Sequence, residues 1–311
     1  MTWLSIAIIA YFLLALVNIL DKFLLENVVN SSRAYTFLVG VLGMAVFILA
    51  PWFLKWPGLN LFFFNILVGA LFPLALLFFY AALKKGEASK TLLLIGGAVP
   101  VFTLIFSLIL LNDSFNSRQW LALSSLLLGT IIISWLPEKQ NFWYKALEVL
   151  DANRKRAYKG LILATLAGIF FSLFFIGSKE AFNNQEFLSA FIWIRGGSFV
   201  FVLLLLFHLR SRKEILKNIK VLNSKKGSLF IANQGLAAGG FLMQNYAISL
   251  TSVALVNALQ GVQYVFIIII GVVATLFYPK FLTENISKPI IIQKIIAVIL
   301  IAFGLYLIAY A

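Results

Sequence analysis

The sequence predicts an all-α protein that crosses a membrane several times. Of its 311 residues, 62% are hydrophobic and only 12% are charged, and the mean hydropathy is +1.00. Soluble globular domains are about 45–50% apolar and about 25% charged. Several stretches hold about 18 or more mostly apolar residues, enough for a helix to cross a hydrocarbon core of roughly 30 Å. The expected fold class is therefore a polytopic membrane protein.

Ten apolar runs, separated by charged residues or by Pro, Gly and Asn, predict ten transmembrane helices. They cover residues 3–24, 34–54, 61–83, 90–111, 118–136, 160–180, 188–208, 228–248, 252–277 and 290–310. The first run is expected to be a membrane helix rather than a cleaved signal, because no Lys or Arg precedes it and no small-residue cleavage site stands out. The turn "ISLTS" between the eighth and ninth runs carries no charge, so this boundary is the weakest.

The two halves of the chain are similar to each other. A shift of 157 residues aligns 7–27 with 164–184, and a shift of 166 aligns 79–88 with 245–254. Five helices per half is an odd number, so the second half would enter the membrane inverted, as alternating access requires. The alternative is chance similarity between apolar helices. The expected organisation is a first five-helix repeat over 1–136, a basic connecting loop over 137–159 and a second five-helix repeat over 160–311.

Basic residues are distributed unevenly between the connections. Of the 25 Lys and Arg residues, 21 fall at connections after odd-numbered runs and three at connections after even-numbered runs. The positive-inside rule therefore predicts that the basic loops, 137–159 and 209–227, are cytoplasmic and that both termini are outside. We expect a prokaryotic plasma (inner) membrane location.

The formal net charge of +14 lies almost entirely between the apolar runs. This placement predicts contacts of the basic loops with anionic lipid head groups and argues against nucleic acid as a partner. Within 137–159, Trp143, Leu147 and Leu150 form one apolar helical edge, which is typical of a short interfacial helix. A solvated linker is the alternative.

Polar residues within the apolar runs are candidates for a substrate site. At 100° per residue, the four polar residues of "ALVNALQGVQY" (254–264) share one stripe of the ninth run. An amide that faces lipid is costly, so this stripe must face protein or a hydrated cavity. Hydrogen bonding between helices, worth about 0.6–2 kcal/mol, is the alternative role. The candidates on the ninth, eighth and first runs are Asn257, Gln260, Gln263, Tyr264, Asn233, Gln244, Asn245, Asn18 and Tyr11.

Arg195 is a further substrate-binding candidate, because it lies inside the seventh run between apolar residues and two glycines. Ionisable residues inside a membrane are costly and usually face the interior of the helix bundle. A guanidinium can bind a substrate carboxylate or phosphate through two hydrogen bonds. The alternative is a structural ion pair, for which the candidate partners are Asp21, Glu180 and Glu186.

Four charged residues near the ends of runs are candidates for gating or ion coupling. Asp21 and Glu180 are the acidic residues closest to the apolar runs, which makes them the proton-relay candidates. Lys22 and Lys179 occupy matching positions in the two halves. Lysines near helix ends usually extend to the head groups, and a gating role is the second interpretation.

Two prolines lie inside apolar runs, Pro73 in the third and Pro100 in the fourth. Each frees a backbone carbonyl and predicts a helix kink, or alternatively a point of close packing.

The composition disfavours other functional classes. The chain has no cysteine and one histidine, so neither thiolate chemistry nor a metal site is expected. No HExxH motif, catalytic dyad or phosphate-binding glycine loop is present. We therefore expect no catalytic residues and no cofactor, and a structural scaffold is disfavoured because no soluble domain is apparent.

Two segments carry a resemblance to a known family. "LLFFYAALKKGEASKTLLLIGGAVPVFTLIFSLIL" (76–110) and "QNYAISLTSVALVNALQG" (244–261) lie at matching places in the two halves. Together with the five-plus-five pattern, they resemble the drug/metabolite transporter superfamily, and within it the EamA-like exporters. That family often has a Glu after the fourth span, where this chain has Asn112 and Asp113, so a role at that corner does not carry over. Family members also usually keep both termini inside.

The resemblance implies secondary transport of small organic molecules. Combined with the polar residues, it leads us to expect an exporter of small polar metabolites such as amino acids, with a central cavity between the repeats. A flippase-like transporter of a lipid-linked anion is the alternative. We expect the protein to act as a monomer or homodimer.

Overall fold

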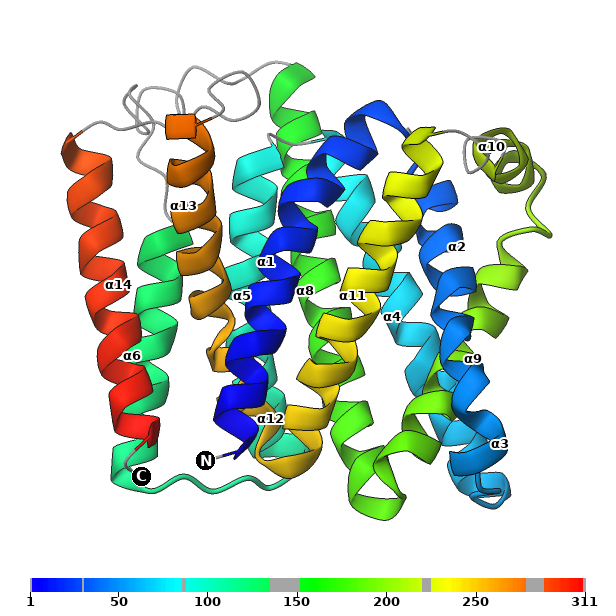
Figure 1. The fold of residues 1–311 in the computed structure, drawn as a ribbon, viewed down its shortest axis with the longest axis horizontal. Coiled ribbons are helices and arrows are strands. Elements are labelled where there is room, and N and C mark those ends of the chain that lie inside the picture. The colour runs from blue at the N-terminus through cyan, green and yellow to red at the C-terminus, as the bar shows by residue number, and fades with distance from the viewer. Residues whose placement is uncertain are drawn as a thin grey trace.

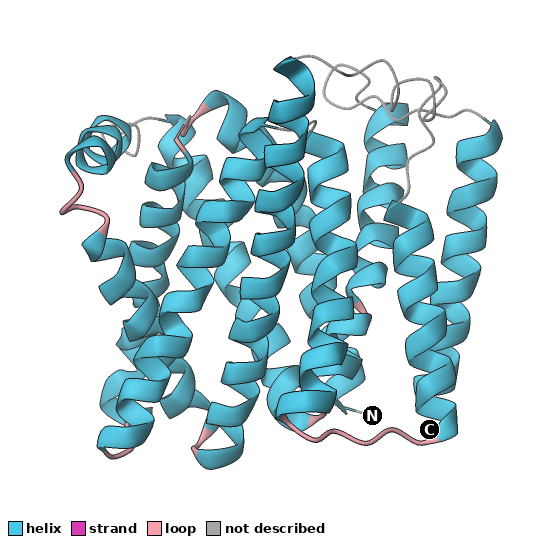
Figure 2. Ribbon diagram, turned by 180° about the vertical axis from the view of Figure 1, so that it is seen from behind, coloured by secondary structure: helices cyan, strands magenta, loops and turns pink. Residues whose placement is uncertain are grey.

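The computed structural model describes residues 2–29, 31–85, 88–134, 152–219, 225–277 and 288–309, and this part of the chain is helical with no strand (Figures 1 and 2). Its helices are α1 (Thr2–Asn27), α2 (Ser32–Leu42), the 3₁₀ helix η1 (Gly43–Leu49), α3 (Ala50–Phe53), α4 (Leu59–Lys85), α5 (Ala88–Leu110), α6 (Ser117–Ser134), α8 (Ala152–Asn184), α9 (Phe187–Leu204), α10 (Leu209–Ile219), α11 (Lys225–Leu250), α12 (Val253–Ala258), α13 (Gln260–Phe277) and α14 (Lys288–Ala309).

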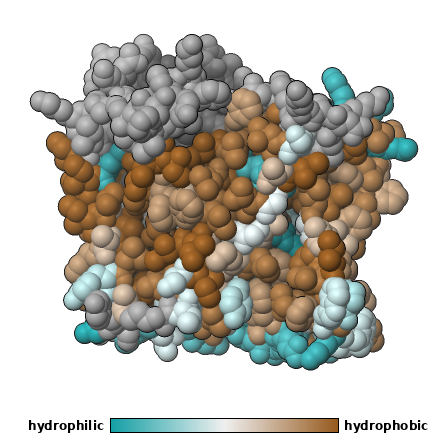
Figure 3. All heavy atoms as spheres, in the orientation of Figure 1, coloured by the Kyte–Doolittle hydropathy of each residue, from teal (hydrophilic) through white to brown (hydrophobic). Residues whose placement is uncertain are grey.

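Seven helical segments within the described residues are long and apolar enough to cross a membrane. They are Thr2–Leu25, Ser32–Phe53, Leu59–Ala82, Lys159–Asn184, Phe187–Leu204, Val253–Ile270 and Ile292–Ala309, and Ile95–Leu110 is a shorter apolar helix. Figure 3 shows a broad hydrophobic band around the molecule, with hydrophilic atoms mostly toward its two ends. Such a band matches the hydrocarbon region of a bilayer. The protein is an integral multi-pass membrane protein.

Two segments expected as continuous helices are interrupted. The second run contains α2, then η1, then α3, so its middle is wound as a 3₁₀ helix. The ninth run is divided at Leu259, where α12 ends with backbone bonds from Leu259 N to the carbonyls of Val256 and Asn257. Ser252 caps the start of α12 by accepting a hydrogen bond from the amide of Ala254. The angular argument for a single stripe on the ninth run therefore fails across Leu259.

The two halves of the chain interleave rather than forming separate bundles. α1 packs along α11, α4 along α8 and α9, α5 along α8, and α6 along α14. Each of these pairs joins a helix before residue 136 to one after residue 151 (Figure 1). The core consequently contains side chains from both halves throughout.

The contact between α4 and α9 is close enough for backbone to touch backbone. A Cβ added at Gly69 would collide with the carbonyl of Ile194, and one added at Gly197 would collide with the carbonyl of Ile66. Pro73 lacks an amide hydrogen, which leaves the carbonyl of Gly69 without its helical donor. Ser198 Oγ donates to that carbonyl at 2.7 Å, so α9 supplies the missing hydrogen bond.

The segment after α9, expected as a basic loop, contains the helix α10. Figure 1 shows α10 almost end-on, whereas the long helices run up and down the picture. Its buried residues, Ser211 and Ile215, lie where it packs on α2. Glu214 accepts a hydrogen bond from Ser31 Oγ at 2.6 Å, which ties α10 to the start of α2. The interfacial helix expected around Trp143 lies outside the described residues.

Candidate functional site

A cavity of about 430 Å³ lies between the two halves. α1 and α4 line it from their middle toward their C-terminal ends, and α5 lines it from its N-terminal half. These ends lie at the edge of the molecule that carries α10 (Figure 1). Small-molecule sites occupy roughly 300–1,000 Å³ and combine apolar walls with a few polar groups. The cavity has both features.

Most of the sequence candidates line this cavity. The lining contains charged, amide and phenolic side chains from α1, α9, α11 and α13. Those expected from the sequence are Tyr11, Asn18, Asp21, Arg195, Gln244, Gln260, Gln263 and Tyr264. Aromatic side chains form much of the remaining wall, and sequence reasoning did not single them out. They are Phe72, Phe79, Tyr80, Phe171, Phe175 and Phe241.

The first turn of α13 presents polar side chains to the cavity. The amides of Gln260 and Gln263 form no hydrogen bond with any other described residue, so both are available to a ligand. Tyr264 lies against α5, where a Cβ added at Gly96 would collide with the Tyr264 hydroxyl. A side chain at Gly96 would therefore force the Tyr264 phenol to move.

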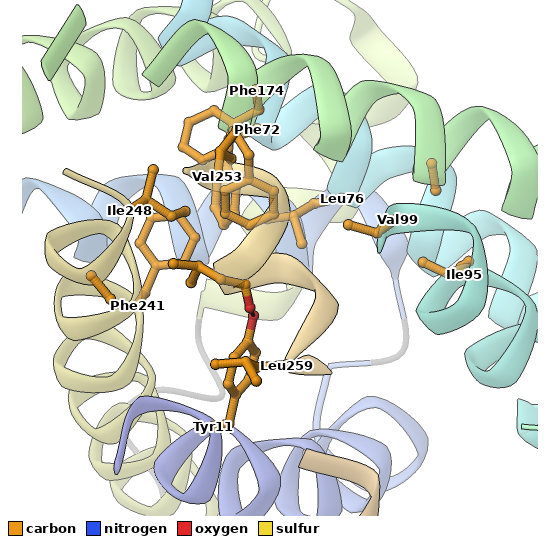
Figure 4. Packing of buried hydrophobic residues seen from close by; sticks show 14 of the residues in the cluster. Tyr11, Phe72, Leu76, Ile95, Val99, Phe174, Phe241, Ile248, Val253 and Leu259 are labelled. Atoms are coloured by element: carbon orange, nitrogen blue, oxygen red, sulfur yellow. Dashed lines mark hydrogen bonds between the residues drawn. The ribbon is translucent and has the colours of Figure 1, made fainter. Parts of the chain in front are cut away.

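A hydrogen-bond network closes the inner end of the cavity at the interruption of the ninth run. Tyr11 Oη donates to the carbonyl of Val256 at 2.8 Å, and Gln244 Nε2 donates to Tyr11 Oη at 3.3 Å. Figure 4 shows Tyr11 reaching from α1 toward this region, with Leu259 beside it. Asn257 bonds to Gln244 and to Thr103 Oγ1. Asn257 thus joins helices and does not line the cavity, which corrects its expected place beside Gln260.

Asn233 and Asn245 also lie outside the lining, contrary to expectation. Asn245 Nδ2 donates to the carbonyl of Phe241, one turn earlier in α11. Asn233 Nδ2 donates to Asp21 Oδ1 at 2.6 Å. Gln234, which follows Asn233, faces the cavity instead. The sequence places the two amides about 100° apart on α11, but which one faces the cavity depends on how that helix packs.

Asp21 connects three helices at the end of the cavity nearest α10. Its Oδ1 accepts hydrogen bonds from Asn233 on α11 and from Tyr35 Oη on α2. The ring of Tyr35 packs at a tilt of 49° against Tyr80, with centroids 4.6 Å apart, and edge-on to Phe230, with centroids 5.1 Å apart. Tyr35 and Tyr80 could not be assigned to Asp21 from sequence, because no spacing rule connects them.

Arg195 is buried, with 7% of its surface exposed, and its guanidinium lies over three phenyl rings. The distances from Arg195 Cζ to the ring centroids are 4.1 Å for Phe241, 4.9 Å for Phe72 and 5.3 Å for Phe191. No carboxylate among the described residues forms an ion pair with it.

The expected structural partners of Arg195 are engaged elsewhere. Glu180 Oε1 accepts from Asn184, and Glu186 pairs with Lys55. Asp21 bonds to Tyr35 and Asn233. The structural ion pair expected as an alternative is therefore absent from the described part of the chain.

Lys179, Pro73 and Pro100 do not line the cavity. Lys179 Nζ donates to the carbonyl of Ser249 at 3.2 Å, near the C-terminal end of α11. The side chain of Lys22 lies outside the described residues. Pro73 and Pro100 sit inside α4 and α5, which continue past them. Within the described residues, no group of three or more His, Cys, Asp or Glu is placed to hold a metal ion.

Asp113 occupies the corner where the family often has a Glu. It accepts a hydrogen bond from Ser252 Oγ at 2.6 Å. Because Ser252 caps α12, Asp113 supports the turn between α11 and α12. The structure therefore gives this acid a local role at the turn between α11 and α12.

Comparisons with known proteins agree with this architecture. Solved structures of 18 chains match, and one of them, described as "Crystal structure of protein", aligns with 98% of this chain and 94% of that chain. The two share 16% sequence identity and a TM-score of 0.60, so the likeness shows the fold alone. No curated protein sequence matches the chain. Residues 1–135 match the model of the EamA-like transporter family. That match, together with the apolar helices, supports a multi-pass membrane protein whose first half is similar to the EamA-like transporters of the drug/metabolite transporter superfamily.

Proposed function

We propose that the protein is a secondary active transporter that exports small polar organic metabolites, such as amino acids, by alternating access. The observation that carries this proposal is the cavity itself. It lies between helices of both halves and combines two charged groups, several amides and aromatic walls. Alternating-access transporters bind their substrates in such a place, near the middle of the membrane between repeats.

The pattern of helix contacts supports ten spans in two inverted repeats, over 1–136 and 160–311. We number the spans in chain order and let the first five correspond to the last five. The first span, α1, then corresponds to the sixth, α8, and the third span, α4, corresponds to the eighth, α11. The pair α1–α11 therefore has α8–α4 as its counterpart, and both pairs pack extensively. The same correspondence converts α5–α8 into a pair of the ninth and first spans, and α13 does pack on α1. The pair α6–α14 converts into itself.

One helix pair has no equally close counterpart in the other half, and this asymmetry supports alternating access rather than a static bundle. The counterpart of the close pair α4–α9 is α11–α2, and those two helices make at most marginal backbone contact within the described residues. Both line the cavity. Exchanging the conformations of the two halves would close α2 onto α11 and separate α4 from α9, so access would move to the other end of the molecule.

The distribution of charge supports export rather than uptake. The cavity extends toward the end that carries α10, whose sequence "LRSRKEILKNI" contains four basic residues and one acid. The positive-inside rule puts this end in the cytoplasm of a prokaryotic inner membrane, with anionic lipids against α10. The cavity would then load from the cytoplasm, as an exporter requires. Asp21, where three helices meet at that end, is the coupling candidate that the structure favours over Glu180.

Reconstitution into proteoliposomes tests the proposal. Vesicles preloaded with an unlabelled pool of amino acids, nucleosides and polyamines should accumulate the labelled substrate by counterflow, saturably and only with protein. Gln263→Leu should reduce this counterflow, while Lys55→Gln, at an exposed ion pair with Glu186, should not.

The alternative is a flippase-like transporter of a lipid-linked anion. Movement of a fluorescent anionic lipid across the same vesicles, without counterflow of any soluble compound, would replace the proposed function with this one.

A further inference from the structure

Arg195 is a buried charge that the described protein does not neutralise. Rings beneath a guanidinium stabilise it through their π-electrons but carry no net charge. A cation left without an anion inside a membrane bundle is costly, and such residues usually mark a substrate or ion pathway. Because Arg195 lines the cavity, a soluble anion can reach it.

The acid of the same cavity is too distant to neutralise Arg195. On α11, Asn233 bonds to Asp21 and Phe241 lies beneath Arg195, eight residues later. On α2, Tyr35 bonds to Asp21, and Gly43, also eight residues later, lies beside Arg195 Nη1. Eight residues of helix rise about 12 Å, so on both helices the residues that contact Asp21 and Arg195 are that far apart along the axis.

This separation also limits how one substrate can use the two charges. The amino nitrogen and carboxyl carbon of an α-amino acid are two bonds apart, about 2.5 Å. A single α-amino acid head group therefore cannot bridge Asp21 and Arg195. Only one of its two charges can be neutralised by these residues at a time.

The kind of anion follows from the charge count. Arg195 is the only basic residue among the described residues that line the cavity. A phosphate monoester carries about −1.5 to −2 charges at neutral pH, more than one guanidinium neutralises. A carboxylate carries one charge, and its two oxygens match the two-pronged geometry of arginine.

We propose that the cavity contains an anion subsite in which Arg195, supported by Phe72, Phe191 and Phe241, binds the carboxylate of the transported molecule. This deepens the proposed function, on which it rests, by naming the substrate class as monocarboxylates, with or without an amino group. Asp21 forms a separate subsite about 12 Å away along the helices.

Matched ligands test the subsite by direct binding titration of the purified full chain in detergent. One set shares a phenyl body: phenylalanine, 3-phenylpropionate and 2-phenylethylamine. A second set shares a small body: alanine, propionate and ethylamine. We expect the acids and amino acids of at least one set to bind the wild type, while the matching amine binds at least tenfold more weakly, a loss of about 1.4 kcal/mol. Equal binding of acid and amine, or binding of neither acid, overturns the assignment.

Variants locate the carboxylate. Arg195→Gln should weaken acid binding about thirtyfold or more, because one partner of a buried charge pair is lost. Arg195→Lys keeps the charge without the two-pronged geometry, so its affinity for acids should lie between those of the wild type and Arg195→Gln. This variant also provides a test if Arg195→Gln does not fold. The exposed control Lys55→Gln, at the ion pair with Glu186, should leave binding of 3-phenylpropionate unchanged. Acid binding that survives Arg195→Gln, or that is lost equally in Lys55→Gln, contradicts the subsite.

Failure of the carboxylate subsite can be distinguished from failure of the proposed transport function. If only neutral or cationic compounds show counterflow, the proposed transport function stands and the carboxylate subsite is rejected. Carboxylate binding that depends on Arg195, without counterflow of any compound, would keep the subsite and reject transport.

Discussion

The α4–α9 seam and the α2–α11 seam would be equivalent under an inverted repeat, yet they are built differently. In the first, glycines bring two backbones into contact and Ser198 bonds to the carbonyl of Gly69. In the second, the helices meet through the rings of Tyr35 and Phe230, and the cavity lies between them. Side chains can separate by changing rotamers, whereas a backbone contact opens only when whole helices move.

Under the proposed function, this difference distinguishes a closed end of the molecule from an accessible end, the one that carries α10. The closed end also holds Asn65 and Gln185, whose amides exchange hydrogen bonds at 2.9 and 3.2 Å between α4 and the turn after α8. At the accessible end, the bonds of Asp21 to α2 and α11 cross from helix to helix beside open space. Substitutions in the α4–α9 seam should therefore reduce stability strongly, whereas substitutions in the α2–α11 seam should affect transport more than stability.

The largest effect is expected from Gly69→Val. The added side chain meets the Ile194 carbonyl, so α4 and α9 must separate, which we expect to cost about 3 kcal/mol of stability and to abolish counterflow. Gly235→Val is the matched control, because a Cβ at Gly235 has no neighbour within 4 Å. It should change stability by no more than about 0.5 kcal/mol. Thermal unfolding in detergent measures both, and equal losses would remove the distinction between the seams.

A medium effect is expected from Ser198→Ala. The change leaves the Gly69 carbonyl without a donor, at a cost of about 1–2 kcal/mol. Pro73→Ala returns an amide hydrogen that can reach that carbonyl within α4. The double variant should therefore lose less than the sum of the two single variants. Strict additivity in this cycle would show that Pro73 and Ser198 are not coupled through Gly69.

The smallest effect on stability is expected from Tyr35→Phe in the α2–α11 seam. It removes the bond to Asp21 but keeps the ring contacts with Tyr80 and Phe230, so the cost should be about 0.6 kcal/mol. If Asp21 couples transport to an ion, the rate of counterflow should change more than stability does. A loss of stability as large as that of Gly69→Val would mean that this seam is as rigid as the other.

Much of the molecule could be predicted from its residues. Helix formation in apolar runs is local, because a backbone in lipid must satisfy its own hydrogen bonds. The expected boundaries accordingly lie close to those of the helices, as at 61–83 against Leu59–Lys85. Arg195 and Gln263 were expected to face the interior, since lipid would not accommodate them, and both line the cavity.

Other features needed the packed structure. The interruption at Leu259 moved Asn257 out of the polar stripe, and no proline lies near it to predict the break. The helix α10 was hidden in a segment whose charges suggested only a loop. The aromatic residues around Arg195 come from α4, α9 and α11, so no local pattern could have assembled them.

The sequence by itself determined that this chain lies in a membrane as helices and that its few intramembrane polar groups face inward, because hydrocarbon imposes those conditions on each segment separately. Tertiary structure alone decided which inward groups satisfy one another and which are left to a ligand. Asn233 bonds to Asp21, whereas the Arg195 guanidinium lies over phenyl rings. That division depends on the relative rotation and depth of whole helices, which is set by packing between segments far apart in the chain.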